Sequence, residues 1–269
     1  MTKQEFDNLK KESVTYKYNS FEYLEYENVQ NYQLIQKDES ILLIYGENSE
    51  IGCFGVSWAA NIAEDLVSAV KRLGPNILIS FIPAKWKDYF NENGFSDYAI
   101  FRGYWIQDIT KIKGYGDYCL LQEKECKQAS EVTLSCRNQS RGFHGESEEG
   151  IRSWIKGENP NAKDSNSRHC SILIHKESDK IVGIALVAVY DYDSTNGPVL
   201  WLREIAVHPD YQGKGIGRKL ILQGIKFGKE REAKRAFLMA DDCNENAIGL
   251  YKSVGFVPDD DVEINLVSG

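Results

Sequence analysis

The most informative residues of this chain lie between positions 205 and 220, where an apolar strand runs through a glycine-rich loop into a helix. The loop contains Gly213, Gly215 and Gly217, and Lys214 and Arg218 add positive charge to a chain of net charge -8. Glycine has no Cβ, so a ligand can approach the backbone closely. Backbone N–H groups at the start of a helix attract anions. The stretch therefore predicts a site for a phosphate-bearing ligand.

The spacing of these glycines excludes two common phosphate-binding motifs. No G-x-x-x-x-G-K-[ST] string occurs, and the loop reads G-x-G-x-G late in the chain rather than G-x-G-x-x-G after a first strand. The loop instead resembles the acyl-CoA loop Q/R-x-x-G-x-G/A of the GNAT acyltransferase superfamily, through Gln212, Gly215 and Gly217. Residues 244–256 are similar to a later motif of that family, N-x-x-A-x-x-L-Y-x-x-x-G-F. Two motifs in the right order are more specific than either one.

The resemblance implies an acetyl-CoA-dependent N-acetyltransferase that needs no metal and transfers an acetyl group directly to a primary amine of a small molecule or peptide. It also implies that the cofactor arm pairs with the strand edge 205–207, where the N–H of Val207 would face the thioester carbonyl. The residues expected to bind the cofactor are Ile205, Ala206, Val207, Gln212, Gly213, Lys214, Gly215, Ile216, Gly217, Arg218, Asn244 and Tyr251.

Acyl transfer to an amine requires a neutral amine, a polarised carbonyl and a stabilised thiolate. The motif match places Tyr251 beside the cofactor sulfur, where a phenol with a pKa of ~10 can donate a proton. The alternative for Tyr251 is a packing role on an amphipathic helix. Glu204 directly precedes the cofactor-pairing strand and is the expected base. An exposed glutamate, or one paired with Arg203, fits the same position.

Five further residues have two interpretations each. Asn244 either contacts the cofactor arm or caps the helix that follows it. His144 is either a base at the acceptor pocket or a surface-loop residue, and Cys243 is expected to be a structural thiol rather than a nucleophile. Asp241 and Asp242 are alternative bases, or else charged residues at a solvated strand end.

The N-terminal half repeats the pattern of the C-terminal half. Residues 34–44 parallel 173–183, and 89–95 parallel 250–256. We therefore predict a mixed α/β fold of two tandem units, each a central mixed sheet flanked by helices, divided near a linker at 111–116. Residues 1–113 would form a degenerate unit, in which bulky Trp58 obstructs the phosphate site, and residues 114–269 the cofactor-binding unit. The alternative for the first half is an unrelated α/β domain whose similarity to the second half arises by chance.

Periodicity predicts the elements of the second unit. The expected helices are 128–138, 146–157, 215–231 and 246–253, and the expected strands include 171–175, 181–190, 199–207, 236–240 and 262–267.

Composition limits the possible partners. Hydrophobic residues make up 42% and charged residues 27% of the chain, as in globular proteins. The longest apolar run, 181–190, is about half of the ~20 residues of a membrane-spanning helix, and the first residues lack an apolar signal core, which predicts a cytoplasmic protein.

The acidic balance argues against nucleic acid and favours a cationic acceptor. Six cysteines lack C-x-x-C pairs, and the histidines do not cluster with them, so no zinc site is expected. A non-catalytic acyl-CoA-binding or interaction module remains the alternative to an enzyme.

Overall fold

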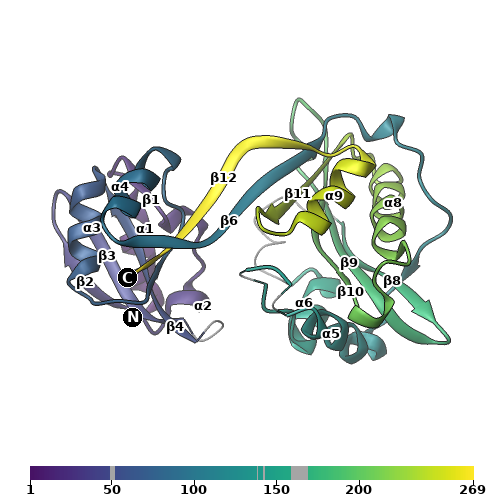
Figure 1. The fold of residues 1–269 in the computed structure, drawn as a ribbon, viewed down its shortest axis with the longest axis horizontal. Helices are drawn as coiled ribbons and strands as arrows, with labels where there is room; N and C mark the ends of the chain where they lie inside the picture. Colours follow the sequence, from purple (N-terminus) through teal and green to yellow (C-terminus); the bar gives the residue numbers. More distant parts are fainter. Residues whose placement is uncertain (49–51, 138, 142, 159–168) are drawn as a thin grey trace. The chain divides into compact units, whose positions relative to one another are not determined.

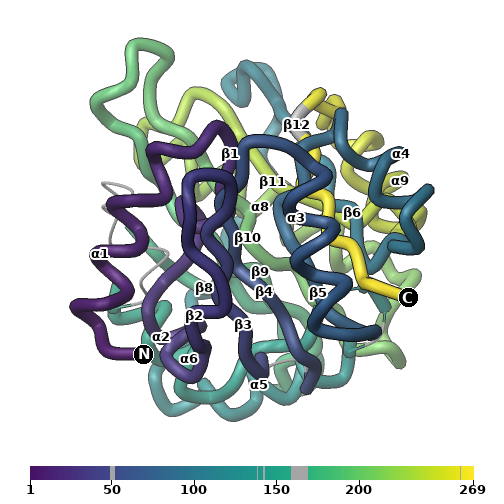
Figure 2. Tube along the Cα trace, turned by 90° about the vertical axis from the view of Figure 1, so that its left-hand side faces the viewer, coloured from purple at the N-terminus to yellow at the C-terminus, as the bar shows by residue number. Residues whose placement is uncertain are grey.

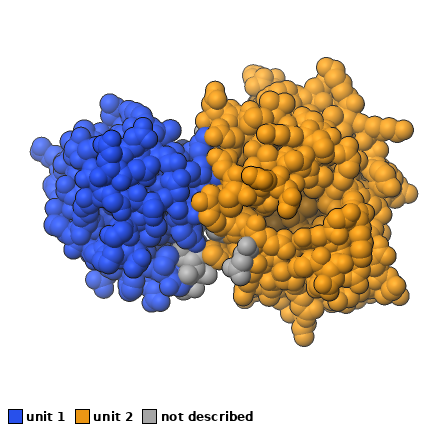
Figure 3. Space-filling model, in the orientation of Figure 1, with its two compact units in different colours: residues 1–101, 262–269 blue, residues 102–261 orange. Residues whose placement is uncertain are grey.

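The computed structural model describes residues 1–48, 52–137, 139–141, 143–158 and 169–269. The chain forms two compact units, which Figure 3 colours separately. The first contains residues 1–101 and 262–269, and the second contains residues 102–261. Among the described residues, no helix combines the length and the apolar character needed to cross a membrane.

The first unit is built on a mixed sheet. Strands β2, β3 and β4 are antiparallel neighbours, and β4 pairs with β5 in parallel (Figure 2). Leu66 and Val70 of α3 are completely buried against this sheet. Its elements are α1 (Lys3–Ser13), β1 (Tyr18–Asn19), α2 (Tyr26–Val29), β2 (Gln33–Lys37), β3 (Ile41–Asn48), β4 (Cys53–Ala60), α3 (Ala63–Lys71), β5 (Ile77–Ile79), α4 (Lys87–Glu92) and the first half of β6 (Phe95–Ile106).

The second unit has the same order of elements around its sheet. Strands β7 to β10 are successive antiparallel neighbours, and β10 pairs with β11 in parallel. Its elements are β7 (Cys119–Leu120), α5 (Cys126–Ser135), α6 (Glu148–Lys156), β8 (His169–Glu177), β9 (Lys180–Tyr190), β10 (Val199–Val207), α8 (Ile216–Lys229), β11 (Arg235–Asp241), α9 (Glu245–Val254) and the first part of β12 (Val257–Ser268).

Helices cover both faces of the second sheet, as Figure 1 shows, with α8 and α9 on one side and α5 and α6 on the other. Leu220 and Ile225 of α8 belong to one apolar cluster, and Ile151 and Trp154 of α6 to another. Residues 181–189 of β9 are buried on both faces, which explains why their sequence is continuously apolar rather than alternating. The predicted mixed α/β fold is therefore confirmed, and the predicted helices agree with α5, α6, α8 and α9 to within a few residues.

The division into compact units differs from the predicted boundary near 111–116. Tyr104 and Ile106, in the second half of β6, pack in the core of the second unit. Ile264 and Leu266, in the second half of β12, pack in the core of the first unit, where Leu266 pairs with Ile79 of β5. Each of these strands therefore contributes to both units. The apolar pattern of a terminal strand predicts that it is buried, but it does not specify which sheet it joins.

Candidate functional site

The candidate site lies where β10 and β11 separate. The parallel ladder joins Val199–Trp201 to Arg235–Phe237, and among the described residues no further pair joins the two strands. Both strands continue beyond this point, β10 as far as Val207 and β11 as far as Asp241. A register shift between Leu202 and Glu204 interrupts the pairing of β10 with β9. Such a bulge bends a strand and changes the direction of its side chains.

The backbone of β10 presents polar groups to this split. Val207 lies opposite Gly183 of β9, and the next amide, of His208, donates to the carbonyl of Val182 at 2.9 Å. In an antiparallel ladder the direction of the backbone groups alternates. Ile205 and Val207 therefore direct their N–H and C=O groups away from β9, toward the split. In agreement, the Val207 carbonyl accepts hydrogen bonds from Gln212 Nε2 at 2.9 Å and Cys136 Sγ at 3.2 Å.

The glycine-rich loop leads into a helix start with no side-chain cap. Gly213 and Gly215 have φ angles of 74° and 78°, and a Cβ on either residue would meet no atom within 4 Å. Gly215 is the N-cap of α8, so no side chain satisfies the first N–H groups of that helix. These groups and the helix dipole provide a positive, sterically open site of the kind that binds anions.

The remaining residues of the loop have different roles. A Cβ on Gly217 would lie 3.1 Å from Leu250 Cδ2, so this glycine allows α8 to pack closely against α9. Gln212 Nε2 also donates to Gln139 Oε1 at 2.9 Å, which links the loop to the segment after α5. Arg218 Nη1 donates to Ser253 Oγ at 2.6 Å, and Lys214 Nζ lies 4.6 Å from the centre of the Tyr211 ring.

Glu204 is a half-buried residue, and one of its carboxylate oxygens, Oε1, is buried without a hydrogen-bond partner among the described residues. Burial raises the pKa of Glu204 to about 8; the negative charge of Glu146 adds to this effect and Arg203 opposes it. Arg203 Nη1 donates to Glu146 Oε1 at 2.5 Å, so the hydrogen-bonded carboxylate partner of Arg203 is Glu146.

Tyr251 lies on α9 near Glu204. Its ring centre is 6.5 Å from that of Tyr104 and 6.2 Å from that of Phe256. Burial raises the pKa of Tyr251 to about 12, and the negative charge of Glu204 acts in the same direction. Charges shift a pKa substantially only from nearby. The structure thus brings together the two residues predicted to be catalytic, with the phenol protonated at neutral pH.

Asp241 is not the solvated strand-end residue that one interpretation expected. Its side chain is buried and forms an ion pair with Arg141, whose Nη2 lies 2.7 Å from Oδ1. Burial by itself would raise the pKa of Asp241, but hydrogen bonds from Arg141 and Cys243 outweigh it and lower the pKa to about 2. Asp241 is therefore a structural anion that holds the 139–141 segment against β11, and a poor candidate for a base.

The other candidate residues also form hydrogen bonds or ion pairs within the protein. Asn244 Oδ1 accepts from the amide of Ala247 at 3.2 Å, so its observed role is to cap α9. Asp242 lies 3.5 Å from Arg102 Nε, and Cys243 Sγ donates to Asp241 Oδ2 at 2.9 Å. The carbonyl of His144 accepts from Arg137 Nε at 2.6 Å; residue 142 of this predicted loop lies outside the described residues.

The sequence interpretation missed two residues of this region, Tyr104 and Arg141, and it placed Glu146 only on a loop that could flank the acceptor pocket. Tyr104 packs against Tyr251, Glu146 acts on Glu204, and Arg141 neutralises Asp241. These residues are far from the two motifs in sequence, and no local pattern marks them. Among the described residues, no group of three or more His, Cys, Asp or Glu side chains could hold a metal ion.

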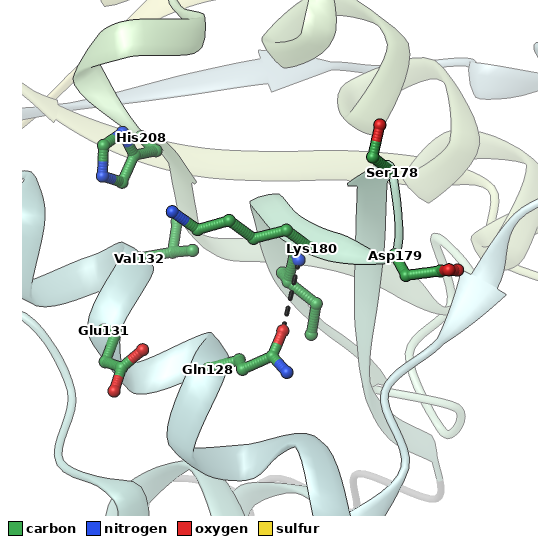
Figure 4. Close-up of a pocket in the computed structure, with 8 residues that line it drawn as sticks. Gln128, Glu131, Val132, Ser178, Asp179, Lys180 and His208 are labelled. Atoms are coloured by element: carbon green, nitrogen blue, oxygen red, sulfur yellow. Dashed lines mark hydrogen bonds between the residues drawn. The ribbon is translucent and has the colours of Figure 1, made fainter.

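A separate cavity of about 460 Å³ lies between α5 and the β8–β9 turn. Figure 4 shows the side chains of Lys180 and His208 directed toward the same space above α5, and Gln128 Oε1 accepting a hydrogen bond from the amide of Ile181 at 3.3 Å. None of the predicted catalytic residues lines this cavity. It is therefore distinct from the split between β10 and β11.

Comparisons with known proteins agree with this geometry. Residues 133–256 match the sequence model of the Acetyltransferase (GNAT) family. The chain is 34% identical to the spermine/spermidine N(1)-acetyltransferase of Bacillus subtilis over 34% of this chain and 62% of that protein. It is 30% identical to the thialysine N-epsilon-acetyltransferase of Sus scrofa, over 40% of this chain and 64% of that protein. It is 34% identical to the mycothiol acetyltransferase of Thermobifida fusca, over 32% of this chain and 27% of that protein. The matches thus span less than two thirds of these relatives.

Solved structures share the fold. A GCN5-related N-acetyltransferase from Sphaerobacter thermophilus matches 85% of this chain and 76% of its own, with a TM-score of 0.59 and 12% identity. One from Kribbella flavida matches 89% of this chain and 90% of its own, with a TM-score of 0.54 and 9% identity. The matched segment 133–256 contains β10, the glycine-rich loop, α8, β11 and α9. Residues 133–256 of this chain are therefore similar to the acetyltransferase (GNAT) family.

Proposed function

We propose that this protein is an N-acetyltransferase that transfers the acetyl group of acetyl-CoA to a primary amine of a small molecule or peptide, by direct attack in a ternary complex. One observation carries the proposal: the outward-facing N–H groups of Ile205 and Val207 line a split between strands that leads to the uncapped start of α8. An extended ligand with amides at one end and phosphates at the other is complementary to this arrangement.

The residues divide between the two ends of such a ligand. The pyrophosphate of acetyl-CoA would bind at residues 212–218, where the first N–H groups of α8, Lys214 and Arg218 supply positive charge. The amide-bearing arm would pair with Ile205 and Val207 as an additional strand would. The N–H of Val207 would then stabilise the oxygen anion that develops on the thioester carbonyl.

Two side chains would move the protons. An alkylammonium acceptor with a pKa near that of lysine, ~10.4, must lose a proton before it attacks. Glu204 would accept that proton, and its raised pKa of about 8 brings it closer to the pKa of the amine than an ordinary carboxylate would be. The amine nitrogen forms a bond to the carbonyl carbon, and the carbon–sulfur bond then breaks. Tyr251 would donate its phenolic proton to the departing thiolate, and the second proton lost by the amine nitrogen would return the phenolate to the phenol.

A cationic acceptor suits the charge of the region. Glu204 follows the register shift of β10 beside the split, and the chain as a whole carries a net charge of -8. The names of two relatives, the spermine/spermidine and thialysine acetyltransferases, specify amine acceptors. These points favour a primary amine on a positively charged molecule.

The test is release of CoA from acetyl-CoA in the presence of spermidine, lysine derivatives and short peptides with free amines. We expect turnover with at least one amine and its loss in the Tyr251→Phe variant. Tyr115→Phe is a matched control, because Tyr115 is exposed. Acetyl-CoA binding without turnover across the panel would support the alternative of a non-catalytic acyl-CoA-binding module.

A further inference from the structure

The first unit contains a split of the same kind as the second. The parallel ladder joins Phe54–Val56 of β4 to Ile77–Ile79 of β5, and no further pair joins these strands among the described residues. Strand β4 continues to Ala60, just as β10 continues past its ladder with β11. The first unit therefore has the strand arrangement that could accept an extended ligand.

A segment of the chain itself occupies this edge of β4. Strand β1 pairs with β4, with Tyr18 opposite Ala60 and Asn19 opposite Ala59. The same two alanines pair with β3. A strand has only two edges, and β3 occupies one edge of β4. β1 therefore lies on the other edge, where β5 pairs with the earlier residues 54–56 of β4.

The next residue, Ser20, completes the pairing. Its amide donates to the carbonyl of Trp58 at 2.8 Å, and its Oγ accepts from the amide of Trp58 at 2.9 Å. Ser20 is only 2% exposed. The backbone groups of Trp58 on this edge are thus already satisfied, as a ligand's amides would satisfy them.

The indole of Trp58 closes the remainder of the gap. Its Nε1 donates at 2.9 Å to the carbonyl of Ser80, directly after β5, and the side chain is completely buried. The sequence interpretation expected Trp58 to obstruct a phosphate-binding loop. In the structure Trp58 instead lies within β4, and its indole bonds to the residue after β5. The turn before α3 has no glycine. The side chain of Asn61 there donates from Nδ2 to the carbonyl of Glu39 and accepts at Oδ1 from the backbone N–H of Lys17, each at 3.0 Å.

We propose that residues 18–20 are a built-in occupant of the first split, in the position that the second unit leaves for the amide-bearing arm of acetyl-CoA. The first unit is closed to this ligand, and the chain binds a single molecule of acetyl-CoA. The comparison between the splits rests on the function proposed above for the second unit.

Amide hydrogen exchange of the full chain, followed by NMR with and without saturating acetyl-CoA, tests both splits together. We expect the amide of Trp58 to exchange slowly in both states. The amides of Ile205 and Val207 should exchange at least roughly tenfold more slowly only when acetyl-CoA is bound. Fast exchange of the Trp58 amide in the free protein, or further protection of this amide by acetyl-CoA, would overturn the proposal that residues 18–20 occupy the first split. Slow exchange of Trp58 in both states with no effect on Ile205 and Val207 would support the occupant and contradict the proposed function.

A variant isolates the contribution of Ser20. Ser20→Ala removes the hydroxyl that accepts from Trp58, so the Trp58 amide should exchange at least roughly tenfold faster, with the acetyl-CoA affinity unchanged. The exposed hydroxyl of Thr15 donates to the nearby carbonyl of Glu12 at 2.8 Å, and the control variant Thr15→Ala should leave the exchange of Trp58 unchanged. Equal exchange of Trp58 in both variants would argue against the occupant. The stoichiometry of the native chain does not depend on either variant: one acetyl-CoA per chain supports the inference, and two would overturn it.

Discussion

The ring of Tyr104 on β6 lies 6.5 Å from the ring of Tyr251 on α9, and the contact joins the proposed acid to a strand outside the family segment 133–256. Tyr104 is 3% exposed, and the ring centre of Phe256 lies 6.2 Å from that of Tyr251. Tyr251 thus packs against two aromatic rings, one of which comes from a strand that begins in the first unit.

This relationship predicts that Tyr104 positions Tyr251. An aromatic pair contributes roughly 0.5–1.5 kcal/mol beyond its buried area, so Tyr104→Leu should lower turnover several-fold at saturating acetyl-CoA. Tyr104→Phe keeps the ring and should retain turnover. In a Tyr251→Phe background the additional loss from Tyr104→Leu should disappear, because the positioned hydroxyl is already absent. Equal effects of Tyr104→Leu in both backgrounds would show that Tyr104 acts only on stability.

Removal of the Tyr251 hydroxyl tests the proposed acid directly. Tyr251→Phe keeps the ring packing, so the fold and the acetyl-CoA affinity should survive. Turnover should fall by roughly 10²–10⁴, the usual contribution of a positioned acid. Steady-state kinetics with one working acceptor, together with calorimetric titration of acetyl-CoA, separates the two effects. Wild-type turnover in this variant would exclude Tyr251 as the acid.

Gly215→Glu tests the phosphate site. The substitution places bulk and negative charge beside the uncapped start of α8, so acetyl-CoA should bind at least roughly tenfold more weakly, on the order of 1.4 kcal/mol. The positive φ of 78° adds backbone strain. Gly74→Glu is a matched control, because Gly74 also has a positive φ, 113°, and open space around it. Calorimetry that finds equal affinities for the two variants would contradict the assignment.

The pH dependence of turnover tests Glu204. Since its pKa is raised to about 8, the wild-type rate should rise with pH up to about 8, as the carboxylate becomes able to accept a proton. In Glu204→Gln the rate should depend on the fraction of acceptor amine that is already neutral. The loss should therefore be greatest at low pH and smallest above the pKa of the amine. If the acidic limb of the pH–rate profile lies at the same pH in Glu204→Gln as in the wild type, water or another residue is the base.

The same pKa has a consequence for stability. Glu204 binds its proton more tightly in the folded protein than in the unfolded chain, so between about pH 5 and 8 unfolding releases a proton and the free energy of unfolding falls as pH rises. Glu204→Gln removes this dependence. Its stability relative to wild type should therefore increase across that range, at a limiting slope of about 1.4 kcal/mol per pH unit. Chemical denaturation at several pH values measures the difference, and Glu149→Gln, at an exposed position, provides the control.

The sequence predicted those parts of the site that depend on local backbone chemistry. Gly213 and Gly215 have left-handed backbone conformations, which favour glycine, so the loop leaves a recognisable pattern in the sequence. The periodicity that predicted the helix 146–157 likewise corresponds to α6, whose residues Ile151 and Trp154 are buried. These features are encoded within a few neighbouring residues.

Contacts between distant residues were not predictable in this way. The ion pair of Asp241 with Arg141, and the proximity of Glu146 to Glu204, form only when separate elements pack together. Trp58 was correctly noticed, but its buried indole and its bond to Ser80 depend on the separation of β4 from β5. Burial follows from apolar character, whereas the partner of each buried group follows from topology.

The course of β12 also constrains the order in which the chain can fold. The amide of Ile77 donates to Ser268 Oγ at 3.0 Å, across a separation of 191 residues. The pairing of β5 with β12 in the first unit therefore joins residues far apart in the sequence. Bringing them together costs conformational entropy before the contacts between them stabilise the fold. Until residues 262–268 arrive, the edge of β5 that pairs with β12 is unprotected, and an unpaired strand edge is a template for association with other chains. During synthesis, the first unit thus depends for protection on the residues that emerge after the entire second unit.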